Sequence, residues 1–133
     1  MLENQTNAEP IIEFIVFGEI PSLKNTLRAR INRGGRPIFF HKDNEVINYK
    51  QNFISQIYPK YSLNLTEKLA VELKIYKPNN RKDGCNLSDM VYDAMQFSGV
   101  IKNDRNIIER HEFDFIDKLK PRVEVKVWEV KSK

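Results

Sequence analysis

The chain has 133 residues, of which 41% are hydrophobic and 30% charged, with a formal net charge of +4. This composition predicts one soluble globular domain and excludes a membrane protein, because no apolar run approaches the roughly 18 residues that a membrane-spanning helix needs. The single cysteine, Cys85, excludes an internal disulfide and favours a reducing, cytoplasmic location. The moderate positive charge favours polyanionic partners without proving one.

The first part of the chain predicts a tail followed by a strand. Residues 1–10 are polar and unlike a signal or transit peptide, so we expect a disordered tail before a single domain that spans residues 11–133. Residues 11–18 are apolar except for Glu13, which predicts a strand buried on both faces.

The segment between residues 24 and 36 carries five cations and no acid. Asparagine, threonine and glycine among the cations predict a loop that follows a phosphate backbone, since each cation releases condensed counterions on contact. A second basic cluster, at residues 77–82, runs directly into Asp83 and favours the same interpretation; a solvated basic loop without a specific use is the alternative. The predicted DNA-binding residues are Lys24, Arg28, Arg30, Arg33, Arg36 and Arg81.

The rest of the chain alternates strands and helices. A glycine turn at residues 34–35 precedes these elements, and Gly99 is expected to end the second helix in the left-handed region. The predicted elements are a strand at 36–41, a helix from 43 or 44 to 58, a strand at 68–77, a helix at 86–97 with Asn86 as its N-cap, and strands at 107–116 and 122–130. Their order predicts an α+β fold, a mixed sheet with two main helices.

Four aspartates fall within a short window around the second predicted helix: Asp83, Asp89, Asp93 and Asp104. Each has a structural explanation when taken alone, because Asp83 suits a turn before Gly84 and Asp104 suits a polar turn. Together, carboxylates that converge from a strand end, a helix and the next loop are what Mg²⁺ prefers as hard oxygen ligands. On a basic chain, this arrangement predicts metal-assisted phosphodiester hydrolysis.

Motifs around the aspartates carry a family resemblance. They are Asp83, Asn86-Leu87, Asp93-Ala94-Met95, Gly99-Val100-Ile101, Asn103-Asp104 and Ile107, with Pro21-Ser22, Asn25, Arg28, Gly35-Arg36 and Tyr49-Lys50 upstream. In order and spacing they resemble the RusA-type endodeoxyribonucleases, phage and prophage Holliday-junction resolvases whose pattern runs D-x-D-N-L-x-K-x-x-x-D-A-L, then G, then D-D. The resemblance covers roughly residues 14 to 130.

The resemblance implies a RusA-like homodimer that cleaves four-way DNA junctions by paired nicking with Mg²⁺, or Mn²⁺ in its place, in DNA recombination and repair. It implies no other small-molecule cofactor and no membrane partner. Asp83 and Asp104 match metal-binding aspartates of the family. Asn86 and Asp93 are expected to orient the metal ligands from outside the coordination sphere; the alternative for Asp93 is that its carboxylate orients a basic side chain.

Two positions depart from the family pattern. The family's second aspartate is Cys85 here, and its lysine is Asp89. A thiol is a poor Mg²⁺ ligand, because soft sulfur prefers Zn²⁺ or Cu⁺. Our hypothesis is that Asp89 substitutes as the third metal ligand, with Lys82 or Lys102 supplying the lost catalytic cation. The alternatives are a junction-binding relative with weak or no cleavage, and a small interaction domain unrelated to DNA.

Overall fold

A computed structural model describes residues 9–21, 29–31, 37–39, 42–80 and 84–131 of the chain. Most of the predicted tail, residues 1–8, lies outside this part, so its predicted disorder stays a prediction. None of the helices in the described part is long and apolar enough to cross a membrane.

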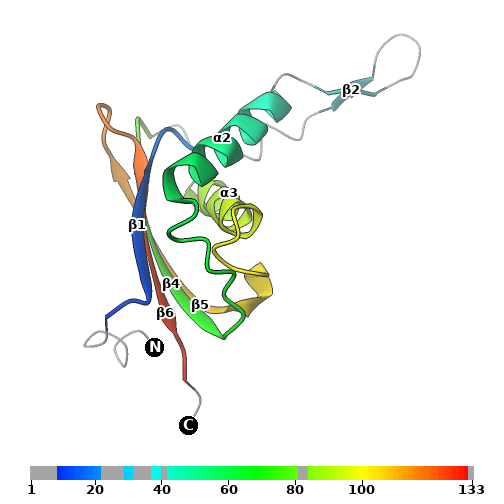
Figure 1. Cartoon of the computed structure of the whole chain (residues 1–133). Helices are drawn as coiled ribbons and strands as arrows, with labels where there is room; N and C mark the ends of the chain where they lie inside the picture. The colour runs from blue at the N-terminus through cyan, green and yellow to red at the C-terminus, as the bar shows by residue number, and fades with distance from the viewer. Residues whose placement is uncertain (1–8, 22–28, 32–36, 40–41, 81–83, 132–133) are drawn as a thin grey trace.

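A four-stranded sheet forms the centre of the molecule, in the order β1-β6-β4-β5 (Figure 1). Its strands are β1 (Ile12–Phe17), β4 (Leu69–Lys77), β5 (Ile107–Ile116) and β6 (Arg122–Glu129). β4 pairs with β5 in parallel and with β6 antiparallel, while β6 also pairs antiparallel with β1. The predicted mixed α+β sheet is therefore confirmed.

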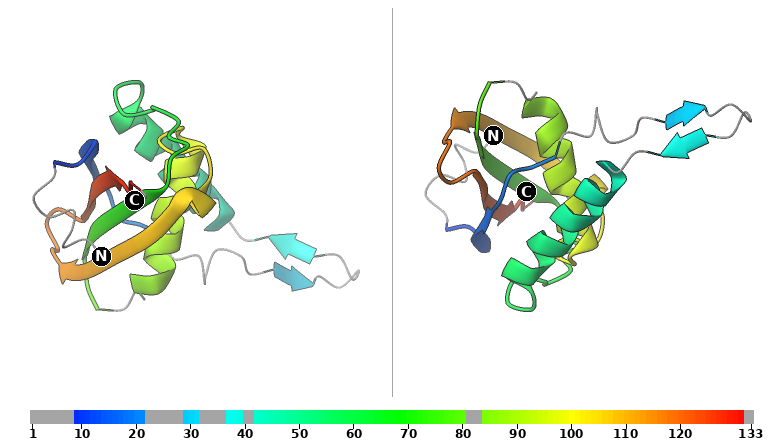
Figure 2. Two further views of the ribbon diagram at one scale, coloured as in Figure 1. Left: turned by 90° about the horizontal axis from the view of Figure 1, so that it is seen from below. Right: turned by 90° about the horizontal axis from the view of Figure 1, so that it is seen from above.

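Two helices, α2 (Lys42–Ile57) and α3 (Gly84–Phe97), lie on the same side of the sheet (Figure 1). α3 connects the parallel strands β4 and β5, as a crossover helix must. Two short strands, β2 (Ala29–Ile31) and β3 (Pro37–Phe39), form a second antiparallel sheet. β3 lies within the strand predicted at 36–41, whereas β2 corrects the prediction of a loop, because part of the basic segment pairs with β3. Figure 2 shows this β-ribbon apart from the four-stranded sheet.

Strand β1 corrects one prediction. Its side chains alternate, with Ile12, Phe14 and Val16 buried and Ile15 and Phe17 exposed. The prediction of burial on both faces was wrong because both helices cover the same face of the sheet, so apolar side chains on the other face stay accessible. The core consists of the inward rows of β1, β4 and β6 and the facing sides of the two helices.

The start of α3 corrects a second prediction. The helix begins at Gly84, so Asn86 lies inside its first turn and is not the N-cap. Directly before Gly84 the sequence has Asp83, and aspartate is one of the residue types favoured at N-caps. Asp83 itself lies outside the described residues.

The end of α3 confirms the prediction for Gly99. Its φ of +81° is in the left-handed region. The N–H of Val100 donates to the carbonyl of Met95 at 2.9 Å, and the N–H of Gly99 donates to that of Gln96 at 3.2 Å. These two bonds form a Schellman motif. The motif turns the chain sharply toward Asp104.

Replacing Gly99 with alanine should destabilise the protein by about 1–2 kcal/mol, the cost of the left-handed region for a residue with a Cβ. Among the described residues, the added Cβ would meet only the Ser62 Cβ at 3.7 Å, an ordinary contact, so backbone strain sets this cost. Urea unfolding measures it. Gly99→Asn is the matched control, because asparagine tolerates this region better; equal stability of the wild type and Gly99→Ala would contradict the assignment.

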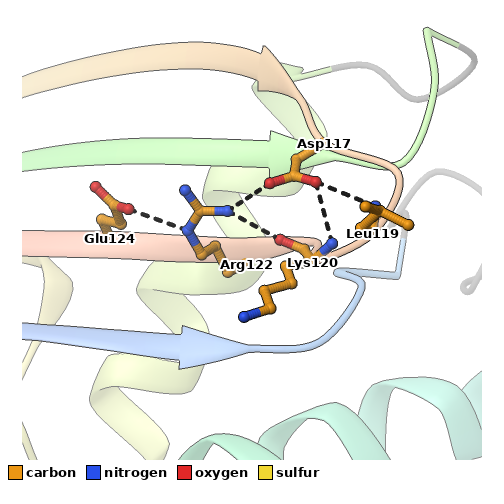
Figure 3. A network of polar contacts seen from close by, with 5 residues as sticks. All are labelled: Asp117, Leu119, Lys120, Arg122 and Glu124. Atoms are coloured by element: carbon orange, nitrogen blue, oxygen red, sulfur yellow. Dashed lines mark hydrogen bonds and ion pairs between the residues drawn. The ribbon is translucent and has the colours of Figure 1, made fainter.

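A polar network closes the turn between β5 and β6 (Figure 3). The Asp117 carboxylate accepts the N–H groups of Leu119 and Lys120, both at 3.1 Å, and pairs with Arg122 at 2.9 Å. The hydrogen bond from Lys120 and that from Arg122 lower the pKa of Asp117. The Arg122 guanidinium also lies 3.7 Å from the centre of the Tyr76 ring. This network fixes the end of the sheet at which β5 returns into β6.

Candidate active site

The four aspartates around α3, Asp83, Asp89, Asp93 and Asp104, form the acidic motif, and the three that the structure describes have accessible carboxylates. Asp89 and Asp93 are exposed on α3, and Asp104 is partly exposed. Within the described part of the chain, none of these three carboxylates accepts a hydrogen bond or joins an ion pair. Three carboxylates without such partners are chemically suited to take up a cation.

Asp104 begins a short 3₁₀ helix, η2 (Asp104–Asn106), whose geometry is fixed by its neighbours. Asn103 caps η2 by accepting the N–H of Arg105 at 2.9 Å. The N–H of Asp104 donates to Gln96 Oε1 on α3 at 3.0 Å. The side-chain amide of Asn106 donates to the carbonyls of Thr66 and Glu67. Asp104 is therefore held beside the C-terminal end of α3, with its carboxylate left open.

The hydrogen bond to Gln96 gives a direct prediction. In Gln96→Ala the N–H of Asp104 loses its acceptor, a loss of about 0.5–1.5 kcal/mol for a neutral bond. Exchange of this amide proton should accelerate about two- to tenfold, as measured by NMR hydrogen exchange. Gln96→Glu keeps an acceptor oxygen at the same place and should show near wild-type exchange; equal exchange in Gln96→Ala and the wild type would show that this bond does not hold η2.

Within a single chain, the predicted metal ligands that the structure describes do not lie close together. Asp89 and Gln96 are seven positions apart on α3, about 10 Å along the helix at 1.5 Å per residue. From Gly84 to Gln96 the corresponding length is about 18 Å. Asp104, which is bonded to Gln96, thus lies far along the helix from its start. No group of three or more His, Cys, Asp or Glu residues suited to a metal occurs in the described part.

The remaining predicted site residues are only partly described. Lys102 is exposed, and its N–H donates to the carbonyl of Leu65 at 2.9 Å. Arg30 lies in β2 and Asn86 in α3, but their side chains are outside the description. The residues that lie wholly outside the described part are Lys24, Arg28, Arg33, Arg36, Arg81, Lys82 and Asp83. Their predicted roles stay predictions.

The structure also shows polar residues that the sequence analysis missed. Glu112 on β5 accepts hydrogen bonds from Ser88 and Tyr92 on α3, and the Arg110 guanidinium lies 4.4 Å from the centre of the Tyr92 ring. In the sequence, Arg110 and Glu112 alternate along a predicted strand like ordinary exposed charges. Only the parallel pairing of β5 beside β4 shows that this row faces α3.

Comparison with known proteins identifies the family. A family model described as endodeoxyribonuclease RusA matches residues 22–128. The crossover junction endodeoxyribonuclease RusA of Aquifex aeolicus (strain VF5) is 38% identical over 60 residues, which are 44% of this chain and 48% of that relative. The match to this curated relative thus spans about half of its length. The family match covers most of the chain, including both helices and strands β2 to β5 and nearly all of β6, although β1 precedes it, and the chain belongs to the RusA endodeoxyribonuclease family.

Proposed function

We propose that this protein is a metal-dependent endodeoxyribonuclease that resolves four-way DNA junctions by paired nicking, in DNA recombination and repair. The observation that carries the proposal is the family match over residues 22–128, which includes the whole acidic motif. The unpartnered carboxylates of Asp89 and Asp104, within the described residues, support it. A DNA substrate and a single cysteine support a cytoplasmic location, and the family also includes prophage resolvases.

Mg²⁺, or Mn²⁺ in its place, is the proposed cofactor. Asp83, Asp89 and Asp104 would hold it, since carboxylate oxygens are the hard ligands that Mg²⁺ prefers. A bound divalent ion supplies an activated water and stabilises the charge that develops on the phosphate. Asn86 and Asp93 would orient the ligands, while Lys82 or Lys102 would stabilise the same phosphate charge.

A homodimer would assemble this site from two chains. The start of α3 and Asp104 lie at opposite ends of the same helix, about 18 Å apart along its axis. Two copies of α3 that run antiparallel across a two-fold axis would bring the start of each helix to Asp104 of the partner. The same axis would produce two equivalent sites, which suits symmetric nicking of a four-way junction.

The basic residues would hold the DNA arms through their phosphates. Arg30 lies in the β2–β3 ribbon, and the other predicted contacts flank this ribbon or precede α3 in the sequence. Such contacts carry little sequence information and make binding strongly dependent on salt.

A second candidate function follows from the two departures in the motif. Cys85 and Asp89 replace a family carboxylate and a family lysine, which favours a protein that binds junctions but cleaves them weakly or not at all.

Nicking of a synthetic four-way junction and of a matched linear duplex, with Mg²⁺ or Mn²⁺, separates the two candidates. Junction-selective nicks that disappear with EDTA and in Asp83→Asn would support the resolvase. Tight junction binding without metal-dependent nicks would support the binding protein instead. A protein without salt-sensitive DNA binding would contradict both.

A further inference from the structure

A polar cluster between α3 and β5 adjoins the acidic motif and has no role in the proposed function. Glu112 Oε2 accepts a hydrogen bond from the Tyr92 hydroxyl at 2.6 Å, and Glu112 Oε1 accepts one from the Ser88 hydroxyl at 3.1 Å. Tyr92 and Ser88 are only 1% and 2% exposed, whereas Glu112 is exposed. Two buried hydroxyls therefore hold an accessible carboxylate in one orientation. Burial and the hydrogen bond to Glu112 raise the pKa of Tyr92, so its hydroxyl stays a donor.

The Glu112 carboxylate keeps free acceptor capacity. An ionised carboxylate has about four acceptor sites, and the described hydrogen bonds to Glu112 come from these two hydroxyls alone. The remaining lone pairs belong to an exposed group. A carboxylate that is fixed in place but not saturated is prepared to bind a further partner.

The hydroxyl groups that hold Glu112 lie on the same part of α3 as the two departures from the family, in helical register with position 85 and next to Asp89. Positions 85, 88 and 92 follow one another at helical spacings of three and four along α3, so they lie along one side of the helix. Asp89 comes directly after Ser88 and is exposed, at the edge of this side. Glu112 therefore lies against the turn of α3 between Ser88 and Tyr92, which contains Asp89.

A cation accompanies the carboxylate on β5. Arg110 precedes Glu112 by two residues, so the two share one face of the strand. Its guanidinium lies 4.4 Å from the Tyr92 ring centre, and it is exposed. Opposite them on β4, Val71 pairs with Arg110 and Leu73 with Glu112, and both are fully buried core residues. β5 thus carries a basic and an acidic side chain at the two positions whose partners on β4 are apolar.

We propose that β5 supplies a carboxylate and a cation in place of those that the family has at positions 85 and 89, with Glu112 as a further metal-binding carboxylate beside Asp83, Asp89 and Asp104, and Arg110, rather than Lys82 or Lys102, as the cation beside the scissile phosphate. This inference rests on the proposed function. The family's carboxylate at position 85 and its lysine at position 89 each have a counterpart of the same charge on β5, namely Glu112 and Arg110. The chain would then belong to the active resolvases despite its altered motif.

A purely structural role for Glu112 predicts a different result from the same substitution. If Glu112 serves only to satisfy the buried Tyr92 hydroxyl, any neutral acceptor of the same size would replace it. Glu112→Gln keeps an oxygen that accepts the Tyr92 hydroxyl and removes the negative charge, while its NH2 group replaces the oxygen that faces Ser88 and can donate to the Ser88 hydroxyl oxygen. This variant therefore separates the two roles without opening a cavity.

We expect Glu112→Gln to keep its thermal unfolding midpoint while its Mn²⁺ affinity, measured by calorimetry, falls at least about tenfold. Junction nicking should fall on the order of 100-fold. The matched control is Glu109→Gln, which removes a carboxylate from the opposite face of β5 and should match the wild type in all three measurements.

Arg110→Gln should keep its Mn²⁺ affinity but lose nicking on the order of 100-fold at saturating metal. Its control, Lys126→Gln, removes a cation from the outer face of the sheet and should keep wild-type nicking.

Restoring the family pattern gives the decisive control. In the double variant Cys85→Asp and Asp89→Lys, the motif has its own carboxylate and lysine again, so adding Glu112→Gln should change nicking less than about threefold. Wild-type Mn²⁺ affinity and nicking in Glu112→Gln alone would overturn the inference and leave the proposed function intact. A wild-type protein that neither binds Mn²⁺ nor nicks junctions would overturn both. An equal loss from Glu112→Gln in the wild-type and restored backgrounds would also overturn the inference, because it would show a structural role.

Discussion

Asp104→Asn should reduce junction nicking about 1000-fold or more while the protein stays folded. The substitution keeps the size of the side chain and removes the charge that would hold the metal ion. The Asp104 carboxylate accepts no hydrogen bond from any described residue, and η2 is held instead by Asn103, Gln96 and the backbone. The free energy of unfolding should therefore change by less than about 0.5 kcal/mol. Nicking rates and urea unfolding on the same preparations check both parts.

Asp114→Asn is the matched control for this loss. Asp114 is an exposed carboxylate on β5 whose described partner is Lys77, at 3.8 Å. The Asp114 side chain is 43% exposed and the ion pair is long, so the pair should contribute little to stability, and Asp114 has no proposed catalytic role. Nicking within a few-fold of the wild type in Asp104→Asn would show that Asp104 is not a metal ligand.

Mixing two inactive variants should restore activity. If each site takes the start of α3 from one chain and Asp104 from its partner, a heterodimer of Asp83→Asn and Asp104→Asn contains one fully wild-type site and one site with both changes. Subunit exchange should thus raise nicking from undetectable to a substantial fraction of the wild-type rate, on one strand per complex. The measurement is a nicking assay on an equimolar mixture after exchange through mild denaturant.

The doubly substituted chain provides the control for the mixing experiment. A chain with both Asp83→Asn and Asp104→Asn, mixed with either single variant, forms no wild-type site and should stay inactive. If the two single variants fail to complement although mass spectrometry, with one of the two chains labelled with ¹⁵N, shows that heterodimers form, each chain must hold its own complete site. The antiparallel arrangement of α3 would then be wrong.

The sequence predicted most of the fold because local patterns specified it. Alternation along β4 and β6, the helical periodicity of α3 and the glycine at its end each have a nearby physical cause, and the structure has them as expected. The exposure of one face of β1 was missed because its apolar run does not reveal that both helices cover the same face of the sheet. The early start of α3 was missed because Asn86 and Asp83 are both suitable N-cap residue types.

The candidate site was harder to predict, because it depends on distances between segments. The spacing of Asp89 and Asp104 in the sequence does not show that they lie at different points along α3, which follows only from the hydrogen bond between Asp104 and Gln96. The role proposed for Glu112 likewise depends on its contacts with Ser88 and Tyr92 across 20 residues or more of sequence. Pattern analysis along one chain contains no signal for such contacts.

Cleavage of a supercoiled plasmid that extrudes a cruciform tests the central claim most directly. A dimer with two metal-dependent sites nicks both strands of the four-way junction within one binding event, so the account predicts linear plasmid in Mg²⁺ or Mn²⁺ and none with EDTA. A matched plasmid without the cruciform should remain supercoiled. Junction-bound but intact plasmid in the presence of either metal would contradict the proposed resolvase.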